Sequence, residues 1–273
     1  MGWTGFTKSR KDKIMSANTP KIVNKVPPEL KEKVLKALII GMNISIFAGA
    51  GISVPSKIPT FRGLNQMDYF EGYPPTYLCT METLRKKPIV AWKFYRHLYE
   101  TVKEAKPSIS HEIIAKWQNR YRTKPGSRFC LITSNFDGLL SEAGAEPVYE
   151  LHGNINKAKC ITCNKNDDMA SLNLENSPPK CSCGEILKPN ITLLNGDYVD
   201  EKSYDEAMQI SCSLYFCIGT SGVNHHAANF LQMIKAKKMA TLIEINPRGT
   251  NLTKDMDYVL RGNAEDILPQ FGI

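Results

Sequence analysis

Short apolar runs alternate along the chain with polar, glycine-containing turns. Four of these runs predict β-strands, because each is rich in β-branched or aromatic residues and leads into a turn. They cover residues 43–47, 129–133, 214–218 and 241–245. Ahead of the first run, apolar residues recur at helical spacing from Glu29 onward, and Gly41 ends the predicted helix.

The repeated order of strand, turn and helix indicates an α/β fold. We expect a Rossmann-like open parallel sheet with helices on both faces, because such sheets place their turns together beyond the strands' carboxyl ends. Residues 27–63, 129–153 and 190–273 are assigned to this domain, and residues 64–128 to a mainly helical insertion. Residues 154–189 are rich in Asn, Lys, Pro and Cys and lack a helical period, which predicts a small inserted module.

Composition and charge change this picture only at the N-terminus. Of the 273 residues, 42% are hydrophobic and 23% are charged, as in an ordinary globular protein. No apolar stretch approaches the ~18 residues that a membrane span needs. The net charge is +8, of which residues 1–26 carry +5. We expect a flexible basic tail there, with an organelle presequence as the alternative. Nucleic-acid binding is not expected of the folded body, and only weakly of the tail.

The eight cysteines fall into two groups. Four form two close pairs, Cys160-x2-Cys163 and Cys181-x-Cys183, and the others are scattered. Two thiolate pairs on tight turns can bind one tetrahedral ion, and four sulfur ligands favour zinc. Because four protein ligands leave no open position for water, we expect one structural zinc ion per chain. The alternative is a set of buried structural thiols.

Gly49-x-Gly51 directly follows the first predicted strand. Small residues in such a turn let backbone amides approach a pyrophosphate at a helix N-terminus. The dinucleotide fingerprint is incomplete, because its third glycine position is Val54 and the acidic residue expected about 20 positions later is missing. By itself this turn is a weak indication of a dinucleotide site.

The wider segment Phe47–Gly63, FAGAGISVPSKIPTFRG, closely resembles the first NAD motif of the sirtuins, the NAD-dependent protein deacylases. Further segments continue the resemblance in family order and extend it to residue 269. They are Thr133–Gly138 (TSNFDG), Glu150–Gly153 (ELHG), the four paired cysteines, Gly219–Ser221 (GTS), Ile243–Pro247 (IEINP), and Gly262-x-Ala264 with Leu268-Pro269 behind it. The joint match is far more specific than the glycine turn.

The resemblance implies a role for each matched position. The resemblance makes His152, Asn135 and Asp137 the catalytic residues. It makes His152 the base that takes a proton from a ribose hydroxyl, a role that suits an imidazole because its pKa lies near working pH. The residues it implies for NAD binding are Gly49, Ala50, Gly51, Ile52, Ser53, Thr60, Phe61, Arg62, Ser134, Asn135, Asp137, Gly219, Thr220, Ser221, Asn246, Pro247 and Ala264. Without this context, a lone histidine after a strand is usually structural.

Four features depart from the family pattern. Ser134 stands where glutamine is usual, Phe136 where isoleucine is usual, and His226 where proline is usual. The segment 190–197 is one residue longer than its family counterpart. We interpret His225 and His226 as loop residues near the groove for the substrate peptide, and include Val223 among the substrate contacts.

The segment Trp92–Leu98 resembles the helix on which the desuccinylase branch of the sirtuins carries Tyr-x-x-Arg. Here the tyrosine is Tyr95, but the arginine position is Leu98. Residues three apart share a helix face, so we expect Tyr95 and Leu98 to line an acyl channel without a cation. The alternative is that both residues are core packing.

The resemblance therefore predicts a zinc-containing, NAD-dependent protein-lysine deacylase. Its substrates would be acylated lysines carrying a neutral acyl group, acetyl or a longer fatty acyl. One alternative is an NAD glycohydrolase or mono-ADP-ribosyltransferase acting at the same site, and another is a non-catalytic NAD sensor. The reduced cysteines favour an intracellular reducing compartment, with cytoplasm or nucleus preferred and the mitochondrion as the alternative.

Overall fold

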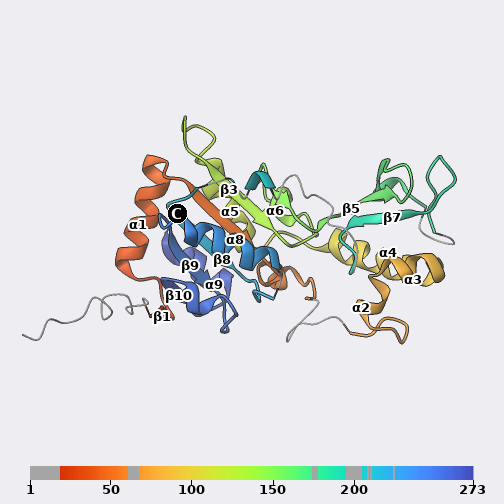
Figure 1. Cartoon of the computed structure of the whole chain (residues 1–273), viewed down its shortest axis with the longest axis horizontal. Coiled ribbons are helices and arrows are strands. Elements are labelled where there is room, and N and C mark those ends of the chain that lie inside the picture. Colours follow the sequence, from red (N-terminus) through yellow and green to blue (C-terminus); the bar gives the residue numbers. More distant parts are fainter. Residues whose placement is uncertain are drawn as a thin grey trace, which may run out of the picture.

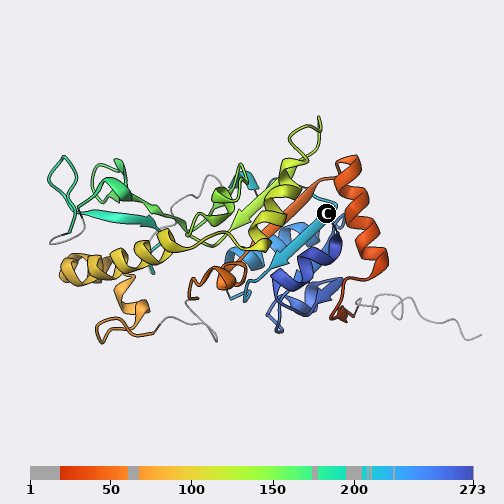
Figure 2. The same ribbon diagram turned by 180° about the vertical axis from the view of Figure 1, so that it is seen from behind.

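A computed structural model describes residues 19–60, 68–173, 178–194, 205–207, 209, 211–223 and 225–272. The molecule consists of a large lobe around one sheet and a smaller, elongated lobe that extends from one side of it (Figures 1 and 2). No helix among the described residues is long and apolar enough to cross a membrane.

The large lobe is built on a seven-stranded sheet in which every pairing between neighbouring strands of the described chain is parallel. The strand order is β1-β10-β9-β8-β2-β3-β4. The strands are β1 (Lys21–Val23), β2 (Ile44–Ala48), β3 (Phe129–Thr133), β4 (Tyr149–Glu150), β8 (Leu214–Ile218), β9 (Thr241–Ile245) and β10 (Tyr258–Leu260). The predicted α/β class with a parallel sheet is confirmed.

Both faces of the sheet are covered because its central strands are apolar on both sides. All five residues of β2 and of β8 are buried. Helices α1 (Pro28–Ile40) and α5 (Ile109–Asn119) supply buried residues to the core on one face, and α8 (His225–Ala236) supplies them on the other. Gly41 ends α1 in the left-handed conformation, with φ of 78°.

The small lobe combines helices with a three-stranded antiparallel sheet of order β6-β5-β7. Its elements are α2 (Pro75–Leu78), α3 (Met81–Lys86), α4 (Pro88–Glu104), β5 (Gly153–Cys160), β6 (Asn166–Asp168) and β7 (Leu187–Ile191). All of these elements except β6 contribute residues to one hydrophobic core. The shorter elements of the chain are α6 (Leu139–Glu142), α9 (Ala264–Ile267), η2 (Ala50–Ile52), η3 (Val54–Ser56), η4 (Met169–Ser171), η5 (Thr253–Asp255) and η6 (Leu268–Phe271).

Two expected boundaries differ from the structure. Residues 64–128 do not form a single insertion: α4 packs in the small lobe, whereas Ile114 and Trp117 of α5 lie in the core of the large lobe. The expectation that residues 1–26 form a flexible tail is wrong for Lys21–Val23, which pair with Tyr258–Leu260 of β10. This pairing covers an edge that β10 would otherwise expose.

Candidate active site

The carboxyl ends of β2 and β8 lie side by side in the middle of the sheet, and from them the chain continues outward in opposite directions. This is the switch point where open α/β sheets bind ligands. The two turns there touch through their backbones: a Cβ on Gly51 would lie 2.7 Å from the Cα of Gly219, and one on Gly49 would lie 2.7 Å from the Cα of Thr220. Close packing of the two turns therefore excludes larger residues at Gly49 and Gly51.

Three polar side chains form a buried network directly beyond β2 and β3. Ser53 donates a 2.7 Å hydrogen bond to Oδ2 of Asp137 and accepts one of 3.0 Å from Nδ2 of Asn135. The same Nδ2 donates to the carbonyl oxygen of Gly49 at 3.2 Å. The side chains are at most 7% exposed. The structure thus brings Ser53 together with Asn135 and Asp137, which lie 82 and 84 positions away in the sequence.

This network has one unused polar atom, Oδ1 of Asn135, which is buried without a hydrogen-bond partner. Such an atom is unfavourable unless a ligand supplies a donor, and the hydroxyl or carboxamide groups of NAD would do so. Burial raises the pKa of Asp137, and hydrogen bonds from the Leu139 amide and the Ser53 hydroxyl oppose this effect. Asn135 and Asp137 therefore offer acceptor oxygens that fit a part of a dinucleotide carrying hydrogen-bond donors and no negative charge.

His111 completes the network and was not predicted from the sequence. Its Nδ1 accepts a 3.0 Å hydrogen bond from the backbone N–H of Ser108, so Nε2 carries the proton and faces the Ser53 hydroxyl at 3.3 Å. The imidazole is fully buried, and desolvation lowers its pKa to about 4. The only local signal is Ser108 at the N-cap of α5, with His111 three residues later in the position of a capping-box partner.

His152 lies between β4 and β5, with its carbonyl oxygen accepting a 2.9 Å bond from the Thr192 amide. The half-buried imidazole lies edge-on to His226, with 6.4 Å between ring centroids. Burial and, to a lesser extent, His226 lower the pKa of His152 to about 4, against the opposing effect of a backbone hydrogen bond with Ser134. His152 is therefore a neutral base at physiological pH.

The histidine pair corrects one expectation. His225 and His226 are not loop residues, because they form the first turn of α8. His226 is 8% exposed and lies beside the candidate base. The expected substrate residue Val223 precedes this turn and is exposed.

The residues expected at the adenosine end come from three neighbouring strand ends. Nδ2 of Asn246, after β9, donates a 2.8 Å bond to the carbonyl oxygen of Thr220, after β8. Ala264 begins α9, which packs against η2 of the glycine turn. Ser221 and Pro247 are exposed beside these contacts, and Thr60 is half-buried. Phe61 and Arg62 lie outside the described residues.

The four paired cysteines converge on one point in the small lobe. Their Sγ atoms all lie within 4.8 Å of one another. Backbone N–H groups of Cys163 and Thr162 lower the pKa of Cys160, and the amide of Cys183 lowers the pKa of Cys181 to about 6. A tetrahedral zinc ion fits four thiolates at this spacing, with no side chain left to activate water.

Comparison with known proteins identifies the family. The family model described as "Sir2 family" matches residues 49–225. The chain belongs to the Sir2 family. The match contains the Ser53–Asn135–Asp137 network, His152 and all four zinc-ligand candidates.

Curated relatives and solved structures agree with this assignment. An NAD-dependent protein deacylase of Aquifex aeolicus is 34% identical over 82% of this chain and 91% of its own length. An NAD-dependent protein deacetylase of Sulfurisphaera tokodaii is 34% identical over 87% of this chain and 93% of its own. A Sir2 homologue in complex with NAD superimposes with a TM-score of 0.77 at 30% identity, covering 94% of this chain and 96% of that one. A Sir2–p53 peptide–NAD+ complex gives a TM-score of 0.74 at 26% identity, covering 88% and 95% of the chains.

Helix α4 of this Sir2 protein separates Tyr95 from Leu98. Tyr95 is fully buried in the small-lobe core, where its hydroxyl donates a 3.0 Å bond to the carbonyl oxygen of Leu78. Tyr95 does not line the cavity beside α4, because its hydroxyl is used inside the core, and its role as a substrate contact stays a prediction. Leu98 lies on the adjacent face of α4 and lines a cavity of about 250 Å³. The residues that line it are Pro59, Asp68, Tyr69, Phe70, Phe94, His97, Leu98 and Thr101.

Proposed function

We propose that the chain is an NAD-dependent protein-lysine deacylase that transfers a neutral acyl group from lysine to ADP-ribose. Membership of the Sir2 family, whose curated relatives here are named NAD-dependent protein deacylases, sets the reaction class. The single structural observation that supports it is the buried Ser53–Asn135–Asp137 network at the switch point, which has an unused oxygen on Asn135. A non-catalytic NAD sensor would not need the neutral imidazole of His152 nearby.

The chemistry divides between the dinucleotide and the protein. NAD supplies an electrophilic sugar carbon when nicotinamide departs, and the oxygen of the acyl-lysine amide is the nucleophile. Asn135 and Asp137 orient the ribose and carboxamide, and the Ser53 hydroxyl fixes both side chains. His152 accepts the proton of the ribose hydroxyl at a ring nitrogen, which its lowered pKa leaves unprotonated.

The 250 Å³ cavity beside α4 supports a neutral acyl group. Pro59 in its wall directly follows Ile58, whose amide donates to the carbonyl oxygen of Ser53, so one backbone hydrogen bond connects the wall segment to the network. The described residues of its wall include no lysine or arginine, whereas Asp68 adds a carboxylate. Among the described wall residues a buried succinyl carboxylate would find His97 but no ammonium or guanidinium partner, and an unpaired buried charge costs about 2–5 kcal/mol. Each buried methylene of a fatty acyl group would gain about 0.8 kcal/mol.

The decisive experiment identifies the product. One lysine peptide is prepared with acetyl, succinyl or myristoyl on the side chain, and each is incubated with NAD. We expect 2′-O-acyl-ADP-ribose to form only when acyl peptide is present, with kcat/KM for succinyl at least roughly 30-fold below the better neutral group. Free ADP-ribose without peptide would instead indicate the alternative, an NAD glycohydrolase, which the departures at Ser134 and Phe136 favour. Fastest turnover of succinyl-lysine would contradict the proposed acyl preference.

The partners follow from the same site. The substrate is an acylated lysine in a protein or peptide, and a related Sir2 protein has been solved with a p53 peptide. An intracellular reducing compartment, with the cytoplasm or nucleus favoured and the mitochondrion as the alternative, is supported by the free, clustered cysteine thiols.

A further inference from the structure

A buried ion pair lies behind the turn that follows β9. Glu244, the fourth residue of that strand, is 1% exposed and forms a 3.4 Å ion pair with Nη1 of Arg261. The Thr253 hydroxyl donates to the same oxygen, Oε2, at 2.7 Å, and the Thr250 hydroxyl donates to the other oxygen, Oε1. A buried carboxylate is unfavourable unless several donors satisfy it, so these contacts fix the positions of Thr250 and Thr253.

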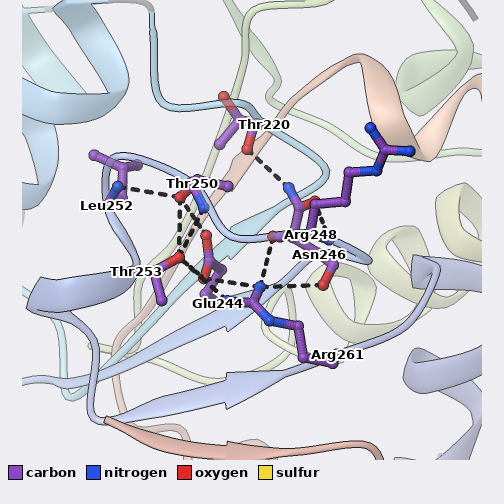
Figure 3. A network of polar contacts seen from close by, with 8 residues as sticks. All are labelled: Thr220, Glu244, Asn246, Arg248, Thr250, Leu252, Thr253 and Arg261. Carbon is purple, nitrogen blue, oxygen red and sulfur yellow. Dashed lines mark hydrogen bonds and ion pairs between the residues drawn. The ribbon is translucent and has the colours of Figure 1, made fainter. Parts of the chain in front are cut away.

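The guanidinium of Arg261 also binds the backbone on both sides of Pro247. Its Nη1 donates to the carbonyl oxygen of Asn246 at 3.3 Å and to that of Arg248 at 2.6 Å. Figure 3 shows this group between the carboxylate of Glu244 and the two carbonyls. The guanidinium is planar and rigid, and its second nitrogen, Nη2, donates to the Thr253 hydroxyl at 3.4 Å, so one side chain connects the turn, the carboxylate and Thr253. Arg261 therefore fixes the backbone of the turn after β9 from the side that faces the protein interior.

The turn after β9, fixed by Arg261, positions the residues expected to contact the adenosine. The Asn246 side chain accepts a 3.2 Å bond from the Arg248 amide and donates a 2.8 Å bond to the Thr220 carbonyl oxygen. On the other side, Leu252 packs so closely that a Cβ on Gly222 would lie 2.7 Å from its Cγ. The turn after β9 is therefore in contact with the turn after β8 at two places.

We propose that the Glu244–Arg261 pair is a positioning device for the adenosine half of NAD. It touches neither the reacting sugar carbon nor His152, and it acts by holding Asn246 and the Gly219–Gly222 turn in the binding conformation. The inference rests on the proposed function, because that function assigns these turns to the dinucleotide. It predicts an effect on NAD affinity with little effect on the rate of the bound complex.

The sharpest test uses a matched pair of substitutions, Thr250→Val and Thr250→Ser. Valine keeps the size of threonine and removes one hydroxyl donor to Glu244, whereas serine keeps the donor. Arg261→Lys keeps the positive charge on a shorter side chain and removes the second guanidinium nitrogen, Nη2, which contacts the Thr253 hydroxyl. Arg122→Gln, which breaks the exposed ion pair with Glu146 in the far loop after α5, is the control.

Each purified variant is assayed for NAD KM, kcat at saturating NAD, and the calorimetric Kd of ADP-ribose, after thermal unfolding confirms a folded state. For Thr250→Val and Arg261→Lys we expect the KM and the Kd to rise together by roughly tenfold, with kcat changed less than about threefold. Thr250→Ser and Arg122→Gln should retain the parent's values. A purely structural role would lower the unfolding temperature and leave the KM and the Kd unchanged.

The outcomes separate this inference from the proposed function. Parent-like ADP-ribose binding by folded Thr250→Val and Arg261→Lys variants overturns the inference, even if the parent deacylates peptide. If the parent binds ADP-ribose but deacylates nothing, the proposed function fails, and the binding data alone decide the role of the ion pair.

Discussion

At the scale of single residues, the assignment of His152 as the base can be tested directly. Replacing it with alanine should lower kcat by about 10²–10⁴-fold, the usual contribution of general base catalysis. ADP-ribose binding should survive, since the polar contacts described for the dinucleotide belong to Asn135, Asp137 and the strand-end turns. Arg122→Gln, which breaks an exposed ion pair in the loop after α5, provides the control. A variant that deacylates at nearly the parent rate would remove His152 from the mechanism.

At the scale of elements, the cysteine cluster joins the β6-β5-β7 sheet to the turn that precedes β7. Cys160 ends β5, and Cys181 lies in that turn; Cys163 is exposed, so Cys163→Ala loses a metal ligand and little packing. We expect one zinc per parent chain, no zinc in Cys163→Ala, and loss of the small-lobe fold, because structural zinc contributes folding energy. Elemental analysis and near-ultraviolet circular dichroism give the readout, with Ser182→Ala as the neighbouring control. Active parent protein without zinc would contradict this prediction.

At the scale of the whole molecule, buried histidines make stability depend on pH. The pKa of His111 is about 4 in the folded chain and about 6.5 when unfolded, so the unfolded chain binds more protons between these values. The free energy of unfolding should fall by about 3 kcal/mol from this group as pH drops from 7 to 4. His152 acts in the same direction, whereas Asp137, whose pKa is raised by burial, opposes both.

Comparing variants isolates the contribution of His111 to this pH dependence. Urea unfolding of His111→Asn at pH 7 and pH 4.5 should show a smaller loss of stability on acidification than the parent shows. His97→Gln, which alters an exposed histidine, should follow the parent. An unchanged pH dependence in His111→Asn would show that this imidazole is not kept neutral by burial.

The sequence by itself determined the features that local pattern encodes. Three predicted strands, 129–133, 214–218 and 241–245, coincide with β3, β8 and β9, because strands buried on both faces are unbroken apolar runs. The first differs by one residue: Asn43 uses its side chain outside the ladder, on the Arg128 amide and the Ser211 carbonyl. The predicted zinc ligands likewise form two pairs on tight turns, each local in sequence, so they could be recognised without knowledge of the fold.

The tertiary structure decided what depends on contacts between distant segments. His111 meets Ser53 across 58 positions, and nothing in its own segment marks it as part of the site. Strand β1 is a three-residue edge with two exposed positions, too short for a period, and only its pairing with β10 makes it a strand. Tyr95 and Leu98 share one helix pattern and are both buried in the small-lobe core, yet the Tyr95 hydroxyl bonds the Leu78 carbonyl whereas Leu98 also lines the cavity. A periodic pattern shows that a face is buried; which segment covers that face depends on the packing of the whole chain.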